Sequence, residues 1–356
     1  MQSENNQSFI SLVRLGINSQ NIPVLVDNWD YIKVLADKQG LLAIIIDSID
    51  KMPEENRPPK LQLLEWIGEM LATYEQRYIV YENAISSLAA FYNQHGFKMM
   101  VLKGYSCSLD WPKPQHRPCG DIDIWQFGQQ KKADKVLFYE KGIKIDNSHH
   151  HHTVFNWMGF TIENHYDFVN IHHSQSNAEI ETLFKELGQD DSYFVVVNGE
   201  KVYLPSPNLH ALFLLRHSMI EFVASSISLR HVLDWAFFIE KHSSDIDWEW
   251  LENTVDKYHM NDYYNCLNAI CVYDLGFESA IFNQVSINTY QKDLVLKEIL
   301  NPAIPNIKPK RILPRVIWKF RRWKANQWKH KLCYKESMWS FFWRGVWNHL
   351  LKPASI

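Results

Sequence analysis

The segment Arg-Pro-Cys-Gly-Asp-Ile-Asp-Ile at residues 117–124 carries two carboxylates, Asp121 and Asp123, separated by one isoleucine. On a β-strand successive side chains point to opposite faces, so both carboxylates project from one face while Ile122 and Ile124 enter the core behind them. Like charges this close cost free energy unless a proton or cation neutralises them, and hard divalent cations prefer oxygen ligands. The pattern predicts a core strand carrying half of a magnesium site, with a solvated strand edge or turn as the alternative.

The same charge argument predicts how stability responds to neutralisation. If repulsion between the two carboxylates dominates in the absence of metal, Asp123→Asn leaves the free energy of unfolding unchanged or raises it.

A short apolar strand and a glycine turn precede the acidic segment. Residues 98–102 read Lys-Met-Met-Val-Leu, which predicts a buried strand, and residues 103–106 follow as Lys-Gly-Tyr-Ser. Glycine permits close approach of the backbone to a ligand, and the first N–H groups of a helix favour phosphate. Together with Arg117 and the acidic strand, this arrangement suits the binding of a metal-bound triphosphate.

Two further strands are predicted downstream, over residues 153–157 and 160–168, on either side of a Met-Gly turn. In the second of these strands Glu163, His165 and Asp167 alternate along the chain, and a period of two places them on one face. This strand therefore offers two carboxylates that can stand near the acidic pair.

The segment from Leu102-Lys103-Gly104 through Arg117 to Asp121-Ile-Asp123 resembles the uncharacterised bacterial nucleotidyltransferases of the DNA polymerase β-like superfamily, which carry a Leu-Lys-Gly, Arg and Asp-X-Asp pattern. The stretch Ile162-Glu163-Asn164-His165 is similar to the family's Glu-X-His strand, and the resemblance is best over residues 95–240. It implies an α+β or α/β fold, with a small mixed nucleotidyltransferase sheet flanked by N- and C-terminal helical regions. The implied activity is metal-dependent transfer of a nucleoside monophosphate from ATP or another nucleoside triphosphate, with release of pyrophosphate.

The resemblance also assigns residues. It implies that Asp121, Asp123 and Glu163 are catalytic and bind Mg²⁺ (or Mn²⁺), with Asp167 as the competing third carboxylate. A rival alignment places residues 169–172, Val-Asn-Ile-His, on the Glu-X-His position, which would put an asparagine in place of the carboxylate and imply an inactive site. The residues expected to contact the nucleotide are Lys103, Gly104, Ser106, Arg117 and His165.

Outside the central strands, apolar residues recur at helical spacing. A hairpin is predicted over residues 193–204, because Asn198-Gly199 suits a type I′ turn. The chain is thus expected to comprise a helical N-terminal region, the nucleotidyltransferase core, a second helical region and a basic, tryptophan-rich segment, over residues 1–95, 96–205, 206–300 and 301–356.

Length and composition set limits on the class of protein. A chain of 356 residues with 46% hydrophobic residues can bury a sizeable core in more than one packed unit. No apolar stretch reaches the 18 or so residues that span a bilayer, and the N-terminus lacks a secretory signal pattern. The five cysteines form no Cys-X-X-Cys motif, so we expect reduced thiols in a cytoplasmic protein, with peripheral membrane association as an alternative.

The last 56 residues differ in charge from the rest. They hold 13 Lys or Arg and one acidic residue, together with six of the 14 tryptophans. Basic residues among tryptophans suit an anionic membrane surface or a nucleic acid, which residues 308–356 would contact. The alternative is a helical cap that packs its tryptophans on the rest of the protein.

The histidine run at residues 149–152 leads into a predicted strand. Alternation places His150 and His152 on one face and His149 and His151 on the other, so a zinc-binding pair is one interpretation. Strand-edge hydrogen bonding, or one histidine near the triphosphate, are the others.

The acceptor of the predicted transfer is open at this point: it is a small molecule, a saccharide, a protein or RNA. The alternative function is a catalytically silent nucleotide-binding or adaptor protein that acts at a membrane surface in polysaccharide assembly.

Overall fold

The structure is a computed structural model that describes residues 2–18, 24–172, 174–286, 288–304, 309, 311–339 and 343. The chain forms two compact units. One, called the helical unit, comprises residues 1–73, 215–243 and 248–335. The other, called the sheet unit, comprises residues 74–214, 244–247 and 336–356.

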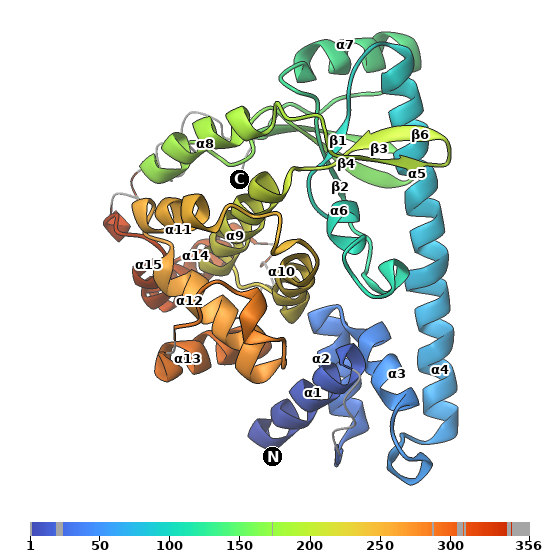
Figure 1. Ribbon diagram of the computed structural model, residues 1–356, viewed down its shortest axis with the longest axis vertical. Coiled ribbons are helices and arrows are strands. Elements are labelled where there is room, and N and C mark those ends of the chain that lie inside the picture. The colour runs from blue at the N-terminus through green and yellow to red at the C-terminus, as the bar shows by residue number, and fades with distance from the viewer. Residues whose placement is uncertain are drawn as a thin grey trace. The chain divides into compact units, whose positions relative to one another are not determined.

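A six-stranded mixed sheet lies in the sheet unit, with the strand order β3-β4-β2-β1-β6-β5 (Figure 1). The pairs β2–β4 and β1–β6 are parallel, and the other neighbours are antiparallel. This mixed sheet with flanking helices confirms the predicted fold class. The strands are β1 (Met100–Val101), β2 (Ile122–Trp125), β3 (His152–Trp157), β4 (Phe160–His165), β5 (Phe194–Val197) and β6 (Glu200–Tyr203).

One face of this sheet is covered by an apolar core. Helices α5 (Gln76–Gln94) and α7 (Gln130–Lys141) contribute apolar residues at helical spacing, and Ile122, Ile124 and Ile162 of β2 and β4 pack among them. Each fully buried aliphatic side chain of this kind stabilises the fold by about 1.5–3 kcal/mol. Because strand residues alternate, the residues between these isoleucines point to the opposite face of the sheet.

Both predicted hairpins are present. In the β5–β6 turn Asn198 has φ 48° and Gly199 has φ 87°, which confirms the type I′ turn. The β3–β4 turn at Met158-Gly159 likewise has two positive φ angles, 50° and 84°. Strand β4 ends at His165 rather than at residue 168, because the chain bends from residue 166 onward.

Three further helices belong wholly or partly to the sheet unit. Helix α6 (Tyr105–Ser108) is a single turn, and α8 (Gln175–Leu187) begins at Ser174, whose side chain accepts a hydrogen bond from the N–H of Asn177. Helix α9 (Pro207–Ala224) starts at a proline, which suits the first position of a helix. A 3₁₀ turn (Pro114–His116) lies between α6 and β2.

Helices make up the other unit, as the periodicity predicted. Helix α2, for example, begins at Asn28, which accepts a hydrogen bond from the N–H of Tyr31, and ends at Gly40 in the left-handed conformation. None of the described helices is long and apolar enough to cross a membrane. The helices are α1 (Gln2–Ile17), α2 (Trp29–Gln39), α3 (Leu42–Asp50), α4 (Lys60–Met70), α10 (Leu229–His242), α11 (Trp248–Lys257), α12 (Asn261–Ala269), α13 (Thr289–Leu300), α14 (Ile312–Ala325) and α15 (Gln327–Cys333).

Residues 327–334 of the basic C-terminal segment pack within the helical unit. The Nζ of Lys329 lies 2.7 Å from the Oε1 of Glu298, and both side chains are buried. The ring of Trp328 lies 5.7 Å from that of Phe222. For residues 327–334, these contacts agree with the alternative of a helical cap that packs its tryptophans on the rest of the protein. Residues 344–356, which include Trp347, lie outside the described residues.

Candidate active site

The parallel pairing of β2 with β4 brings the predicted site residues together. Asp123 is the register partner of Glu163, and Trp125 is the partner of His165. Register partners on neighbouring strands share a face of the sheet, so these four side chains stand opposite the apolar core. Residues 40 positions apart in the sequence are thereby placed side by side.

Asp123 is the most buried member of the group, with no exposed surface. Its Oδ1 lies 3.1 Å from the Nζ of Lys103 and 3.1 Å from the Nε2 of His165. A buried carboxylate is costly unless paired and hydrogen-bonded, and these two cations supply the pairing. Burial disfavours the charge of Lys103, but the carboxylates of Asp123, Asp121 and Glu163 outweigh it and raise the pKa of the lysine.

His165 is held by two different bonds. Its Nδ1 lies 3.1 Å from the carbonyl oxygen of Asp167, which places a proton on Nδ1, and its Nε2 faces Asp123. Burial lowers the pKa of His165, but bonds to Asp123 and Glu163 raise it to about 9. His165 is therefore an imidazolium at neutral pH when protons are the only cations at the site, and its charge balances the carboxylates.

Glu163 stands at the edge of the buried group, with 24% of its side chain exposed. Its Oε2 lies 3.7 Å from the Nε2 of His165. Burial raises the pKa of Glu163, but the hydrogen bond from His165 and nearby positive charges lower it overall, so the side chain is ionised at neutral pH. Ligand atoms of Asp123, Glu163 and His165 all lie within 4.8 Å of one another, which fits a cation-binding site.

Asp121 precedes β2 by one residue and is exposed. Desolvation by neighbouring atoms and the negative charge of Asp123 raise its pKa, and Lys103 partly opposes them. Its backbone oxygen accepts a hydrogen bond of 2.9 Å from the hydroxyl of Tyr81. Asp121 thus supplies an exposed carboxylate beside a buried one, and a divalent cation would relieve their repulsion.

The glycine turn lies against the same backbone. Gly104 has φ 72° and ψ −93°, and a Cβ at this position would lie 2.7 Å from the Oη of Tyr81 and 3.5 Å from the backbone oxygen of Asp121. Only glycine fits here without displacing Tyr81. Because α6 has four residues, it provides little of the helix dipole that the sequence led us to expect at this turn.

The other two predicted nucleotide contacts lie in more buried positions. The hydroxyl of Ser106 donates a hydrogen bond of 3.0 Å to the carbonyl of Leu102, within its own turn. Arg117 is buried, and its Nη1 donates to the carbonyl of Pro118 at 3.4 Å. The structure therefore brings together Lys103, Asp121, Asp123, Glu163 and His165, and holds Ser106 inside the turn that carries Lys103.

The choice of third carboxylate is narrowed by geometry. Asp167 lies beyond the end of β4 and forms an ion pair with Lys185 of α8. The residues of the rival alignment, 169–172, are not in a strand, and the N–H of Val169 donates to the carboxylate of Glu181 at 3.0 Å. Glu163 is the carboxylate in register with Asp123.

Sequence reasoning missed His152 as a member of this site. His152 is the first residue of β3 and pairs with His165, and its Nδ1 lies 3.8 Å from the Oε2 of Glu163. The signal was present in the hairpin, because counting outward from the Met158-Gly159 turn pairs these two histidines. One interpretation of the run placed a single histidine near the triphosphate, but the sequence alone did not identify which one.

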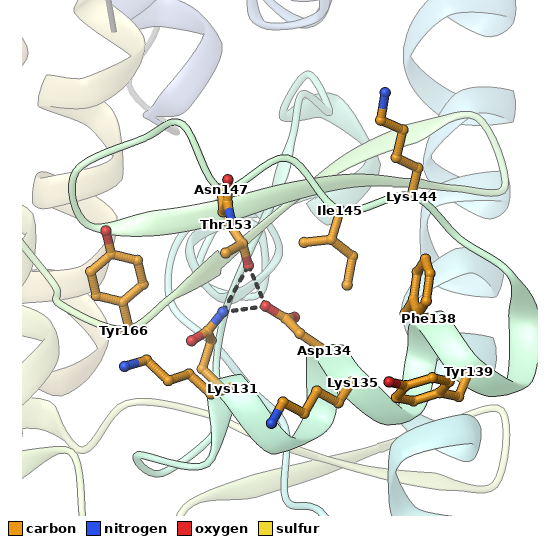
Figure 2. A pocket seen from close by; sticks show the side chains of 11 residues that line it. Lys131, Asp134, Lys135, Phe138, Tyr139, Lys144, Ile145, Asn147, Thr153 and Tyr166 are labelled. Carbon is orange, nitrogen blue, oxygen red and sulfur yellow. Dashed lines mark hydrogen bonds between the residues drawn. The ribbon is translucent and has the colours of Figure 1, made fainter. Parts of the chain in front are cut away.

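A separate cavity of about 640 Å³ lies on the other face of the same strands (Figure 2). Thr153 and Asn164 alternate with the site residues along β3 and β4, and both donate to Asp134 of α7, at 2.8 Å and 2.7 Å. Figure 2 shows Asp134 pointing from α7 toward Thr153. These bonds occupy Asp134 within the protein. The cavity is lined by Gln130, Lys131, Asp134, Lys135, Phe138, Tyr139, Lys144, Ile145, Asn147, Thr153 and Tyr166.

Comparison with known proteins identifies a matching family. The sequence model of a family described as "Uncharacterised nucleotidyltransferase" matches residues 26–272. No curated protein matches the chain. Among solved structures, the chain is similar to an antigenic nucleotidyltransferase-like protein from Paracoccidioides brasiliensis, at 14% identity and a TM-score of 0.35, over 57% of this chain and 96% of that one.

Proposed function

Because the chain belongs to this family of uncharacterised nucleotidyltransferases, we propose that it moves a nucleoside monophosphate from a metal-bound nucleoside triphosphate, such as ATP, to a nucleophile on an acceptor, releasing pyrophosphate. The observation that carries the proposal is the register of β2 and β4, which sets Asp123 beside Glu163. Asp121, two residues before Asp123, adds an exposed carboxylate at the same end of the strand.

Asp121, Asp123 and Glu163 are the proposed ligands of Mg²⁺ (or Mn²⁺). Their oxygens are the ligand type that such ions prefer, and the charges that now balance Asp123 come from Lys103 and His165. When bound, the ion neutralises charge on the transferring phosphoryl group and aligns the attacking and leaving oxygens.

Lys103 is the proposed phosphate contact. Its ammonium lies 3.1 Å from Asp123, yet 23% of its side chain is exposed, so it borders both the carboxylates and solvent. Gly104 lets the turn that carries Lys103 approach the backbone of Asp121 closely. Arg117 and Ser106 are retained as further proposed contacts of the triphosphate, with Ser106 supporting the turn through Leu102.

Glu163 is the proposed general base. It is ionised, partly exposed, and within 3.7 Å of His165, which orients it. A carboxylate at this position can accept the proton of an acceptor hydroxyl as the new phosphodiester bond forms. The acceptor is a small molecule, a saccharide, a protein or RNA.

One observation favours a second candidate, a catalytically silent nucleotide-binding or adaptor protein. Lys103 and His165 already balance the charge of Asp123 without a metal ion. Such a protein would bind a triphosphate without consuming it. For either candidate we propose a cytoplasmic location, with peripheral attachment to a membrane as the alternative. A role at a membrane surface in polysaccharide assembly belongs to the silent candidate.

Transfer of label separates these two candidates. The protein is incubated with Mg²⁺, a cell extract and each nucleoside triphosphate labelled at the α-phosphate, and the extract is then searched for labelled products. The enzyme is expected to label one class of acceptor and to release unlabelled pyrophosphate, whereas the silent protein binds triphosphate and labels nothing. Asp37→Asn, which removes an exposed carboxylate of α2 in the helical unit, serves as the charge-matched control.

A further inference from the structure

A group of histidines stands beside the proposed catalytic carboxylates. Ligand atoms of His151, His152 and His165 all lie within 4.8 Å of one another. The ring centroids of His151 and His152 are 4.3 Å apart, and that of His165 lies 5.4 Å and 5.2 Å from them. His152 and His165 are buried, while His151 is partly exposed.

The end of the β3–β4 hairpin explains why adjacent histidines meet. His152 opens β3 opposite His165, and the chain bends at His151. The carbonyl of His151 accepts the N–H groups of Tyr166 and Asp167, at 3.0 Å and 3.1 Å, so the bend is fixed to the end of β4. Because of the bend, the two side chains do not follow the alternation of a regular strand.

His152 is the observation that points to a ligand. Only 6% of its surface is exposed, and neither of its ring nitrogens has a hydrogen-bond partner among the described residues. Its nearest carboxylate oxygen, Oε2 of Glu163, lies 3.8 Å from Nδ1. Buried polar atoms without partners are rare in folded proteins, and a bound ion is a common explanation for them.

His165 already has the second contact that metal-binding histidines show. Its Nδ1–H donates to the carbonyl of Asp167 at 3.1 Å, so Nε2 is the ligand atom, and the ion would replace the Nε2 proton that now faces Asp123 at 3.1 Å. A ligating histidine almost always donates its other ring N–H to a carbonyl, a carboxylate or water, and this bond fixes the orientation of the ring.

The type of ion follows from the type of ligand. Three imidazoles with one carboxylate, Glu163, suit Zn²⁺ and related transition-metal ions, whereas Mg²⁺ takes oxygen ligands. Zinc–nitrogen bonds of about 2.0–2.1 Å place ligand atoms about 3.4 Å apart in a tetrahedron. Ligand atoms that now lie up to 4.8 Å apart would close by up to about 1.4 Å, through rotation of the partly exposed His151 ring and small shifts of the others.

We propose that His151, His152 and His165, with Glu163, bind a transition-metal ion of the Zn²⁺ class. The inference rests on the histidines and goes beyond the proposed transfer reaction, although the two sites share Glu163 and His165. The ion would lie next to the proposed Mg²⁺ ligands Asp121 and Asp123. One centre would then hold a transition-metal ion beside Mg²⁺.

Cobalt binding tests the proposal directly. Co²⁺ is titrated into the full-length, metal-free protein without a polyhistidine tag, and visible absorption is recorded, with Zn²⁺ added afterwards as a competitor. We expect one equivalent of Co²⁺ with the intense absorption of four-coordinate nitrogen and oxygen ligation, and its displacement by Zn²⁺. His152→Ala and His151→Ala are each expected to weaken Co²⁺ binding at least about tenfold, since loss of even an outer-shell partner costs about 10–100-fold.

Matched variants separate this site from its surroundings. His172→Ala removes an exposed histidine whose ring lies 5.9 Å from that of His150, and it should leave Co²⁺ binding unchanged. Asp121→Asn should also leave it unchanged, while weakening binding of Mg²⁺ with a triphosphate. Because His151 is partly exposed, His151→Ala keeps the test valid if His152→Ala does not fold.

Two results would overturn the proposal. One is Co²⁺ affinity that is the same in the wild type and in folded His151→Ala and His152→Ala. The other is Co²⁺ affinity that falls in Asp121→Asn as far as in the histidine variants, which would put the ion on the carboxylates. Loss of label transfer with intact Co²⁺ binding would count against the proposed transferase activity alone.

Discussion

Replacing Gly104 by alanine tests the close packing that positions Asp121. The backbone at Gly104 has φ 72° and ψ −93°, outside the regions that L-residues normally adopt, and strain of this kind costs roughly 1–3 kcal/mol. The new Cβ would lie 2.7 Å from the Oη of Tyr81, so the ring must move. Its movement breaks the 2.9 Å hydrogen bond to the carbonyl of Asp121, worth about 0.5–1.5 kcal/mol.

The expected loss for Gly104→Ala is therefore about 1.5–4.5 kcal/mol in the free energy of unfolding, measured by urea denaturation. Gly96→Ala is the matched control, because Gly96 has a similar φ of 75° and no atom within 4 Å of its added Cβ. The control should lose only the backbone part, about 1–2 kcal/mol. Gly104→Ala should therefore lose more stability than Gly96→Ala, and the excess includes the contact with Tyr81.

A double variant checks the mechanism. Tyr81→Phe removes the hydroxyl that the alanine Cβ would strike, so Gly104→Ala should cost less in the Tyr81→Phe background than in the wild type. Equal losses in Gly104→Ala and Gly96→Ala, or an equal cost of Gly104→Ala in both backgrounds, would refute the reasoning.

Three further predictions concern charge and packing. Removal of residues 308–356 should lower the melting temperature and leave the protein prone to aggregation, because Glu298 would lose its buried partner Lys329. An unchanged melting temperature would favour a purely surface role for the segment. Lys103→Met should weaken binding of Mg²⁺ with a triphosphate, measured by calorimetry, at least about tenfold, as loss of one charge-assisted contact predicts; unchanged affinity would remove Lys103 from the site. Burial raises the pKa of Glu181 to about 7, above its ordinary value of 4.5. The folded state therefore binds the carboxyl proton of Glu181 more tightly than the unfolded state does, and the contribution of this group to the free energy of unfolding falls as pH rises from about 4.5 to 7. Urea denaturation across that range should show a decline of up to about 3 kcal/mol that Glu181→Gln reduces, and an equal decline in the variant would contradict the assignment.

Local features were predictable because short-range chemistry determines them. The Asn198-Gly199 turn requires two positive φ angles, and the alternation of acidic residues with Ile122 and Ile124 indicates a strand whose isoleucines enter the core. The strand at residues 98–102 was also expected, but only two of its residues, Met100 and Val101, pair in the sheet.

Features that depend on pairing between distant segments were harder to predict. His152 joins the site because β3 lies antiparallel to β4, and the cavity beside Asp134 depends on how α7 covers the other face. Neither arrangement has a signal within one segment of the sequence.

The balance of charge at Asp123 also depends on distant segments and was not predictable from the sequence. The sequence alone led us to expect that neutralising Asp123 relieves repulsion and preserves stability. In the structure Lys103 and His165 both lie 3.1 Å from this carboxylate, so Asp123→Asn would take the carboxylate partner from the buried His165 and the partly exposed Lys103 and should destabilise the protein. The repulsion argument holds instead for the exposed Asp121, whose pKa is raised by desolvation and by Asp123.

Asp121→Asn is therefore the most direct test of the proposed catalytic centre. Transfer of labelled monophosphate from the preferred triphosphate and the metal-free melting temperature are measured side by side for the wild type, Asp121→Asn and the control Asp37→Asn. We predict a fall in transfer of about 10³-fold for Asp121→Asn, with a melting temperature equal to or above that of the wild type. Asp37→Asn should keep wild-type transfer. An Asp121→Asn protein that retains most of its transfer activity would contradict the assignment of these carboxylates as the metal site.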